Sequence, residues 1–261
     1  MARPHGRKSV IWNLKDLLAD PMADLEMLTK EVDRQVQRFE GLREKLSADM
    51  PSEAFVEALR LAEAIARSTG KLGAYAYLWF SQDTTDQGAR SFKAKVEELQ
   101  AGLANRMLFF DLWWQTLDDT TAGRLLAASG DYAYHLETIR RFKDHTLTEP
   151  EEKIINVKSV TGRQAMVGLY DLFTSGLSYT LKIRGRIRRL TREDLMIYVR
   201  DPDARVREAA YRELHRVFAR HADVIGDIYK TLVLDWKQEN LGLRRHRSPI
   251  SVRNLSNDVP E

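Results

Sequence analysis

The sequence predicts a mainly helical, all-α protein of antiparallel long-helix hairpins and a helix bundle, with one small β-hairpin near residues 177–190. Apolar residues recur at steps of three and four along most of the chain, which places them on one face of each helix. Residues that favour helix starts, such as an Asp-Pro pair or a Thr followed by acids, precede these stripes. Alternation of apolar and polar residues marks one short segment as strands.

The first long helix is expected to begin at Asp20-Pro21, because proline loses nothing at a position whose N–H has no helical partner. Its apolar stripe is expected to reach Leu46. A short amphipathic turn precedes it at residues 11–18, and Trp12 and the leucines of this turn are expected to dock on a larger element.

Two long helical patterns follow, at residues 51–82 and 87–117, and a short polar joint at residues 81–86 separates them. A joint this short favours an antiparallel hairpin in which the two apolar stripes are buried together. Small residues on one arm face large aromatic residues on the other, which suits close helix packing. The stripes are Phe55, Ala58, Ala62, Ile65, Leu72, Ala76 and Trp79 on the first arm, and Phe92, Val96, Leu99, Leu103, Met107, Phe110, Trp114 and Leu117 on the second.

Further helices are expected after Asp118, over residues 131–143, and from Thr148 to Phe173 as one helix. The last of these tolerates Gly162 and Gly168, which suggests close packing there because glycine costs about 1 kcal/mol against alanine in a helix.

Residues 177–190 predict the β-hairpin, with a turn at Arg184-Gly185. Thr191 and Asp194 form a capping-box pattern for a short helix. One last long helix is expected from Asp203, with a stripe that runs to Trp236. Residues 254–261 resemble the start of another helix, so the chain is expected to be truncated there.

The charge is dense but nearly balanced, with 41 basic and 38 acidic residues, so a nucleic-acid partner is not predicted. The absence of cysteine excludes disulfides, thiolate nucleophiles and cysteine-ligated metals. Neither a signal peptide nor a membrane-spanning run is evident, so a cytoplasmic protein without membrane contact is expected.

No metal site and no bound cofactor are predicted for this chain, because it has no HExxH motif. His215 and His221 share one expected helix, but a separation of six residues leaves them about 120° apart around its axis. The other histidines are expected to be isolated: His5, His135, His145 and His246.

No catalytic residue is predicted either. The pairs Asp118-Asp119 and Glu151-Glu152 could serve as acid and base, but their places at helix starts favour capping. Residues 159–163, Ser-Val-Thr-Gly-Arg, lack the spacing and the lysine of a phosphate-binding loop.

Two arginine clusters, at residues 184–189 and 244–247, could bind phosphates or peptide carboxylates, although a solvated surface is the simpler interpretation. The aromatic residues at helical spacing are interpreted as core rather than as a ligand platform: Tyr75, Tyr77, Trp79, Trp113 and Trp114. The substrate-binding residues therefore stay unknown.

Six segments in order resemble the N-terminal half of oligoendopeptidase F, of the thimet-oligopeptidase-like zinc peptidases. They are Trp12-Asn13-Leu14-Lys15-Asp16-Leu17, residues 72–86 with their Asp83-Thr84-Thr85-Asp86 joint, residues 151–172, Arg205-Val206-Arg207-Glu208-Ala209-Ala210-Tyr211, Arg247-Ser248-Pro249 and Arg253-Asn254.

This resemblance implies a helical bowl whose channel admits short peptides, and two domains, 1–112 and 113–261. In that family the zinc ligands and the water-activating glutamate lie in the C-terminal half, so zinc and peptidase activity would need that half as a partner, in the same chain or another. The chain alone is expected to supply channel wall and a size filter. The alternative is a stand-alone helical module that binds a protein or peptide.

Overall fold

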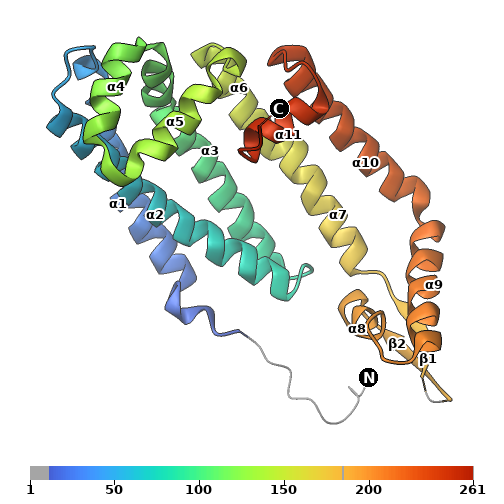
Figure 1. The fold of residues 1–261 in the computed structure, drawn as a ribbon. Coiled ribbons are helices and arrows are strands. Elements are labelled where there is room, and N and C mark those ends of the chain that lie inside the picture. The colour runs from blue at the N-terminus through green and yellow to red at the C-terminus, as the bar shows by residue number, and fades with distance from the viewer. Residues whose placement is uncertain (1–11, 184, 261) are drawn as a thin grey trace. The chain divides into compact units, whose positions relative to one another are not determined.

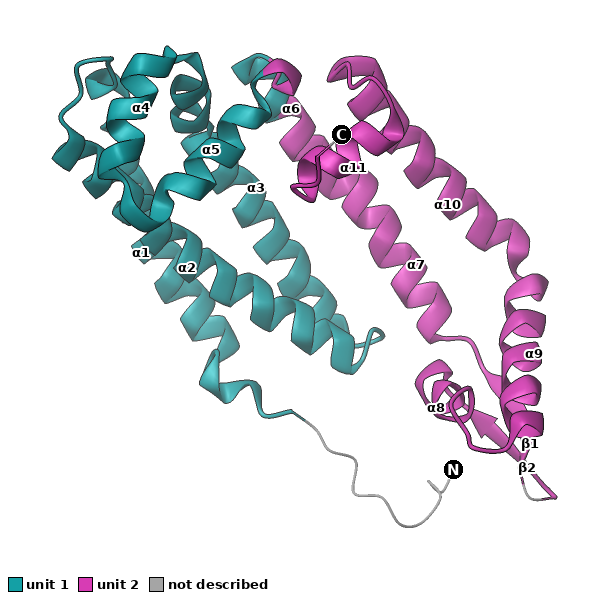
Figure 2. Cartoon of the chain, in the orientation of Figure 1, with its two compact units in different colours: residues 1–143, 148–153 teal, residues 144–147, 154–261 magenta. Residues whose placement is uncertain are grey.

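The structure is a computed structural model that describes residues 12–183 and 185–260. Within these ranges the chain is almost entirely helical, with a single two-stranded antiparallel sheet, so the predicted all-α class is confirmed. The chain divides into two compact units (Figure 2), residues 1–143 with 148–153, called unit 1, and residues 144–147 with 154–261, called unit 2. The expected domains 1–112 and 113–261 stay a prediction beside this division.

Unit 1 is a set of helices around the long hairpin of α2 and α3 (Figure 1). A 3₁₀ turn at Leu14–Asp16 precedes its first helix. Its helices are α1 (Pro21–Glu40), α2 (Ser52–Gln82), α3 (Gln87–Thr116), α4 (Asp119–Ala128) and α5 (Ala133–Arg141), followed by the first turn of α6 (Glu149–Ser159).

The predicted hairpin is confirmed, and its joint is held by two aspartates. The Asp86 carboxylate accepts hydrogen bonds from the N–H groups of Gly88 and Ala89 at 2.7 and 3.1 Å, so it caps α3. Asp83 accepts from the N–H and hydroxyl of Thr85, which closes the turn after α2. The short loop therefore forces α2 and α3 to pack against each other.

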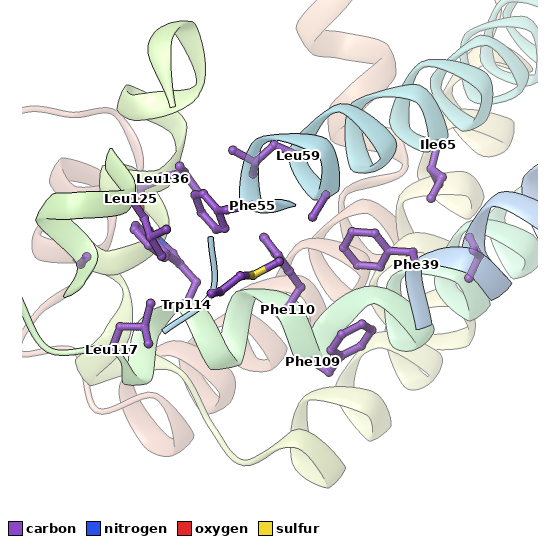
Figure 3. Packing of buried hydrophobic residues seen from close by; sticks show 14 of the residues in the cluster. Phe39, Phe55, Leu59, Ile65, Phe109, Phe110, Trp114, Leu117, Leu125 and Leu136 are labelled. Carbon is purple, nitrogen blue, oxygen red and sulfur yellow. The ribbon is translucent and has the colours of Figure 1, made fainter. Parts of the chain in front are cut away.

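The core of unit 1 is aromatic (Figure 3). The fully buried ring of Phe55 on α2 stacks on Phe110 and Trp114 of α3, with centroid distances of 5.8 and 5.3 Å. Phe39 of α1 packs against Phe109 and Phe110 at 5.5 and 5.4 Å. Burial of such large side chains is the main stabilising contribution to a helical unit of this kind.

The turn before α1 docks through its leucines and not through its tryptophan. Leu18 is buried, and Leu14 and Leu17 pack against the neighbouring cluster. Trp12 is 66% exposed, so its predicted docking is wrong. It lies ahead of the turn, and only its backbone carbonyl is held, by Gln82 Nε2 at 3.2 Å.

Unit 2 contains the remainder of α6, the β-hairpin and the last helices of the described chain. Strands β1 (Tyr179–Ile183) and β2 (Arg186–Leu190) pair as predicted, with Gly185 at φ +81° in the turn. That positive φ suits glycine, which has no Cβ to clash. The helices are α7 (Ala165–Ser175), α8 (Arg192–Tyr198), α9 (Ala204–Arg220), α10 (Ala222–Lys237) and α11 (Pro249–Ser256).

The helix expected over residues 148–173 is confirmed as one continuous helical run from α6 to α7, with a π-helical turn at Val160–Gln164 inside it. The close packing expected at Gly162 and Gly168 is wrong. A Cβ built at either residue would meet nothing within 4 Å. Gly162 lies inside the π-helical turn, where the backbone departs from α geometry and a side chain is dispensable.

The last long helix, in contrast, is two helices, α9 and α10, which meet at His221 with φ −117°. α9 packs on β1, whereas α10 packs along α7 (Figure 1), so the apolar stripe must change direction between them. The predicted helix start at Asn254 is wrong. Ser248 forms the capping box of α11 instead, and Asn254 lies within that helix.

Candidate functional site

The described residues contain no cluster of three or more histidine, aspartate or glutamate side chains that could hold a metal ion. His215 packs against Tyr211 with a centroid distance of 4.2 Å. His221, at the junction of α9 and α10, packs edge-on against Phe173 at 5.3 Å. Both therefore have local packing roles, while His135 is exposed on α5 and His5 lies outside the described residues.

His145 and His246 were expected to be isolated, and this expectation is wrong. Their rings stack with a centroid distance of 3.6 Å and an interplanar angle of 19°. His145 Nδ1 lies 2.8 Å from the carbonyl oxygen of Arg244, and Arg244 Nη1 donates to the carbonyl of His145 at 3.2 Å. These bonds draw residues 144–147 into unit 2, a long-range contact that no local spacing reveals.

The stacked pair has one buried member. His246 is 6% exposed, and its burial, together with the nearby His145 and Arg244, lowers its pKa. Burial disfavours the charged imidazolium, and neighbouring positive charges add to that effect. His246 is therefore held neutral at a pH where a solvated histidine would begin to charge.

One member of each carboxylate pair, Asp118 and Glu151, bonds at a helix start as the sequence indicates, whereas Glu152 is buried. Asp118 accepts from Thr121 N–H at 2.9 Å and from its hydroxyl at 2.7 Å. Asp119 pairs with Arg140 at 2.8 Å. Hydrogen bonds from Thr148 hold Glu151 in the same way, and they lower its pKa. The bonds from Thr121 and Thr148 lower the pKa of Asp118 and Glu151, so these two carboxylates are stabilised as anions and are unsuited to donate a proton near neutral pH.

The residues 159–163 form the end of α6 and the π-helical turn, not a phosphate-binding loop. The aromatic interpretation is correct for most members: Tyr75 and Trp114 are buried, and Trp79 and Trp113 pack against the clusters of unit 1. Tyr77 is 60% exposed and lies outside that core.

The two arginine clusters differ in how exposed their side chains are. Arg244 of the second cluster faces the protein, where it binds Glu239 at 2.9 Å as well as the His145 carbonyl. In the first cluster Arg186, Arg188 and Arg189 are exposed along β2, and Arg184 lies outside the described residues. Arg245 and Arg247 of the second cluster are exposed as well, so each cluster has arginines that are open to a ligand.

Most exposed large hydrophobic side chains of the described chain lie in unit 2. α7 buries only Thr174, and α10 buries only Ile228, although both helices are rich in apolar residues. A helix that is apolar around its circumference is usually covered on several sides. We call the exposed set the apolar helix surface, and its members on α6, α7 and α10 are Ile154, Val157, Val167, Leu169, Val224, Tyr229, Val233 and Leu234. The sequence stripes gave no signal for it.

Comparison with known proteins finds a family model and two solved structures that are similar to this chain. Residues 113–179 match the family model described as Oligopeptidase F. The chain is similar to the crystal structure of oligoendopeptidase-F from Enterococcus faecium, with a TM-score of 0.75 and 18% identity over 90% of this chain and 47% of that one. A candidate peptidase from Chlamydophila abortus is similar with a TM-score of 0.52 and 19% identity, over 95% and 42% of the two chains.

No curated protein matches the chain by sequence. The predicted resemblance to the N-terminal half of oligoendopeptidase F is confirmed by the family model and by the shared fold. The chain spans about half the length of the solved structures it resembles, 47% and 42%. No helix in the described part is both long and apolar enough to cross a membrane.

Proposed function

We propose that this chain is the non-catalytic helical portion of an oligoendopeptidase F-like zinc peptidase that hydrolyses short peptides in the cytoplasm. The zinc ion, its ligands and the water-activating glutamate belong to a C-terminal catalytic half, in the same polypeptide or a separate one. In this proposal the chain supplies channel wall and a size filter for peptides, and it contributes no catalytic residue.

The apolar helix surface is the observation that carries the proposal. Its side chains lie on α6, α7 and α10, which bury little against the rest of unit 2. Single exposed apolar side chains are ordinary on protein surfaces, whereas several of them on neighbouring helices such as α7 and α10 suit an interaction site. Covering such area releases roughly 25 cal/mol per Å². A second half of similar length, as in the Enterococcus faecium structure, is a fitting cover.

A stand-alone helical interaction module is the second candidate, and unit 1 favours it. That unit buries a continuous aromatic core, and few of its large apolar side chains are exposed. A self-sufficient module should be monodisperse alone, whereas a peptidase portion should associate with its catalytic half.

The test expresses the chain alone and together with the polypeptide encoded directly downstream of Glu261. We expect the chain alone to bind no stoichiometric zinc and to leave an internally quenched peptide uncut. The pair should associate, bind zinc and cleave, with an HExxH helix in the downstream part. Replacing the glutamate of that HExxH should abolish cleavage but not association.

Three results would overturn the proposal: one tightly held zinc per chain, cleavage by the chain alone, or a downstream sequence without a zinc-binding motif. A chain that is monodisperse and does not bind the downstream polypeptide would favour the interaction module.

A further inference from the structure

The β-hairpin of unit 2 has two outer strand edges, one along β1 and one along β2. They differ in the groups that bond to their outward backbone atoms. β1 and β2 are antiparallel, with Thr180 opposite Arg189 and Lys182 opposite Ile187. In such a pair the backbone groups of alternate residues point toward the partner strand, and those between them point away. One hydrogen bond therefore fixes the direction of all the others.

That bond comes from Thr180. Its N–H donates to Glu213 Oε1 on α9 at 2.6 Å, so the backbone of Thr180 points away from β2. The residues in the same phase on β2 are Ile187 and Arg189, whose backbone groups must point away from β1. Within the described ranges, neither residue has a backbone hydrogen bond to an element outside the hairpin.

The β1 edge is occupied. α9 packs against β1, and Arg216 binds Glu213 through Nε and Nη2 at 2.5 and 2.6 Å. These bonds and the Thr180 N–H lower the pKa of Glu213, which keeps the acceptor ionised. α8 contacts β2, but the outward backbone groups of Ile187 and Arg189 have no hydrogen bond of this kind among the described residues, and Ile187 is 75% exposed.

We propose that the open edge of β2 binds an extended acidic peptide as a third strand. Side chains directly opposite one another on paired strands lie about 4.5–5.5 Å apart, close enough for charge pairing. Arg186 and Arg188 point to one face of the hairpin and Ile187 to the other, by strand alternation. The peptide pattern that fits is acidic, apolar, acidic, with backbone hydrogen bonds to Ile187 supplying affinity.

Charge argues against the other occupants of this edge. A second copy that paired through β2 would bring arginine opposite arginine, which is destabilising. A nucleic acid would satisfy the arginines but has no amide N–H groups for the backbone edge. The backbone contribution is therefore the property to test.

The experiment measures binding of a fluorescent peptide Ser-Glu-Val-Glu-Ser, capped at both ends, to the purified chain by anisotropy. With valine opposite Ile187, the valine N–H faces the protein and the glutamate N–H groups face solvent. N-methylation of the valine should weaken binding about fivefold, since the hydrogen bond from the valine N–H to the Ile187 carbonyl is lost, whereas N-methylation of a glutamate should change it little.

Variants of the chain provide the reciprocal test. Ile187→Pro removes an outward N–H without removing a bond between β1 and β2, so it should abolish binding while circular dichroism and Tm stay unchanged. Ile187→Ser keeps that N–H and should bind better than Ile187→Pro.

The double variant Arg186→Glu with Arg188→Glu tests the charge pairing and should prefer a Ser-Lys-Val-Lys-Ser peptide. Arg212→Glu, at an exposed arginine of α9, is the matched control and should bind as the parent does.

Equal effects of the two methylations, or none, would overturn the proposal. Tighter binding of a single-stranded RNA oligonucleotide that is insensitive to Ile187→Pro would also overturn it in favour of charge alone. A dimer lost in Ile187→Pro would assign the edge to a second copy. The proposed function is tested by cleavage with a catalytic half and this edge by binding alone, so either can fail without the other.

Discussion

The burial of His246, stacked on His145, makes the stability of the fold depend on pH. Because the folded pKa of His246 lies below the ordinary value of 6.5, the unfolded chain takes up a proton first as the pH falls. The free energy of unfolding should therefore be highest above pH 6.5, and should decrease as the pH falls from there toward the folded pKa, by at most about 1.4 kcal/mol per pH unit.

His246→Phe keeps an aromatic ring against His145 but removes the titration. We expect its Tm to depend less on pH than that of the parent between pH 8 and pH 5.5, as measured by thermal unfolding. His215→Phe, which keeps a ring against Tyr211 on α9, should keep the parental dependence. An unchanged slope in His246→Phe would show that other groups control this transition.

Among the elements, the α6–α7 segment contains two glycines with open space where a Cβ would lie, Gly162 and Gly168. A Cβ at Gly168 would contact no atom within 4 Å, so Gly168→Ala should raise the free energy of unfolding by about 0.5–1 kcal/mol. In contrast, a Cβ at Gly73 would lie 2.6 Å from Gln100 Nε2, which donates to the carbonyl of Thr69. Gly73→Ala must move the Gln100 amide away from Thr69, so it should gain less stability than Gly168→Ala.

Urea unfolding of the two variants checks this pair of expectations. Destabilisation by Gly168→Ala in the isolated chain would mean that α7 is packed more tightly than its exposure indicates. Normal stability combined with lost association in the presence of the catalytic half would instead place Gly168 at the proposed contact.

Helix starts could be predicted from the sequence because capping is local. Asp20, Asp86, Asp118 and Thr191 each bond to N–H groups within three residues, so short patterns suffice. The break at His221 could not be predicted, because α9 and α10 pack on different elements that are distant in sequence. The stack of His145 on His246 was missed for the same reason.

At the scale of the whole molecule, periodicity predicted which apolar residues share one face of a helix, but not whether another part of the protein covers that face. The apolar helix surface is a property of the packed structure: α7 is apolar along its length, yet it buries only Thr174. The resemblance to oligoendopeptidase F could be predicted because it depends on short residue patterns in order, and the fold bears it out.

The apolar helix surface should make the isolated chain bind hydrophobic dyes and self-associate. Replacing Leu169 and Val233 together by glutamine should reduce binding of a hydrophobic dye and slow concentration-dependent self-association, since both side chains are exposed at 47% and 43%. Dye fluorescence and sedimentation velocity measure the two effects. Tyr77→Gln in unit 1 removes an isolated exposed ring and should alter neither. Dye binding that persists in the double variant would locate the dye-binding surface elsewhere.

Glu213 has a consequence for ordered aggregation. A fibril that grows by strand pairing needs two unpaired strand margins in every molecule, because each molecule must pair with a neighbour on both sides. In this chain the Glu213 carboxylate takes up the margin of β1 at Thr180, which leaves a single margin for assembly. Any ribbon-to-ribbon joining of this protein would thus terminate after two molecules, and polymerisation through the hairpin has no way to propagate.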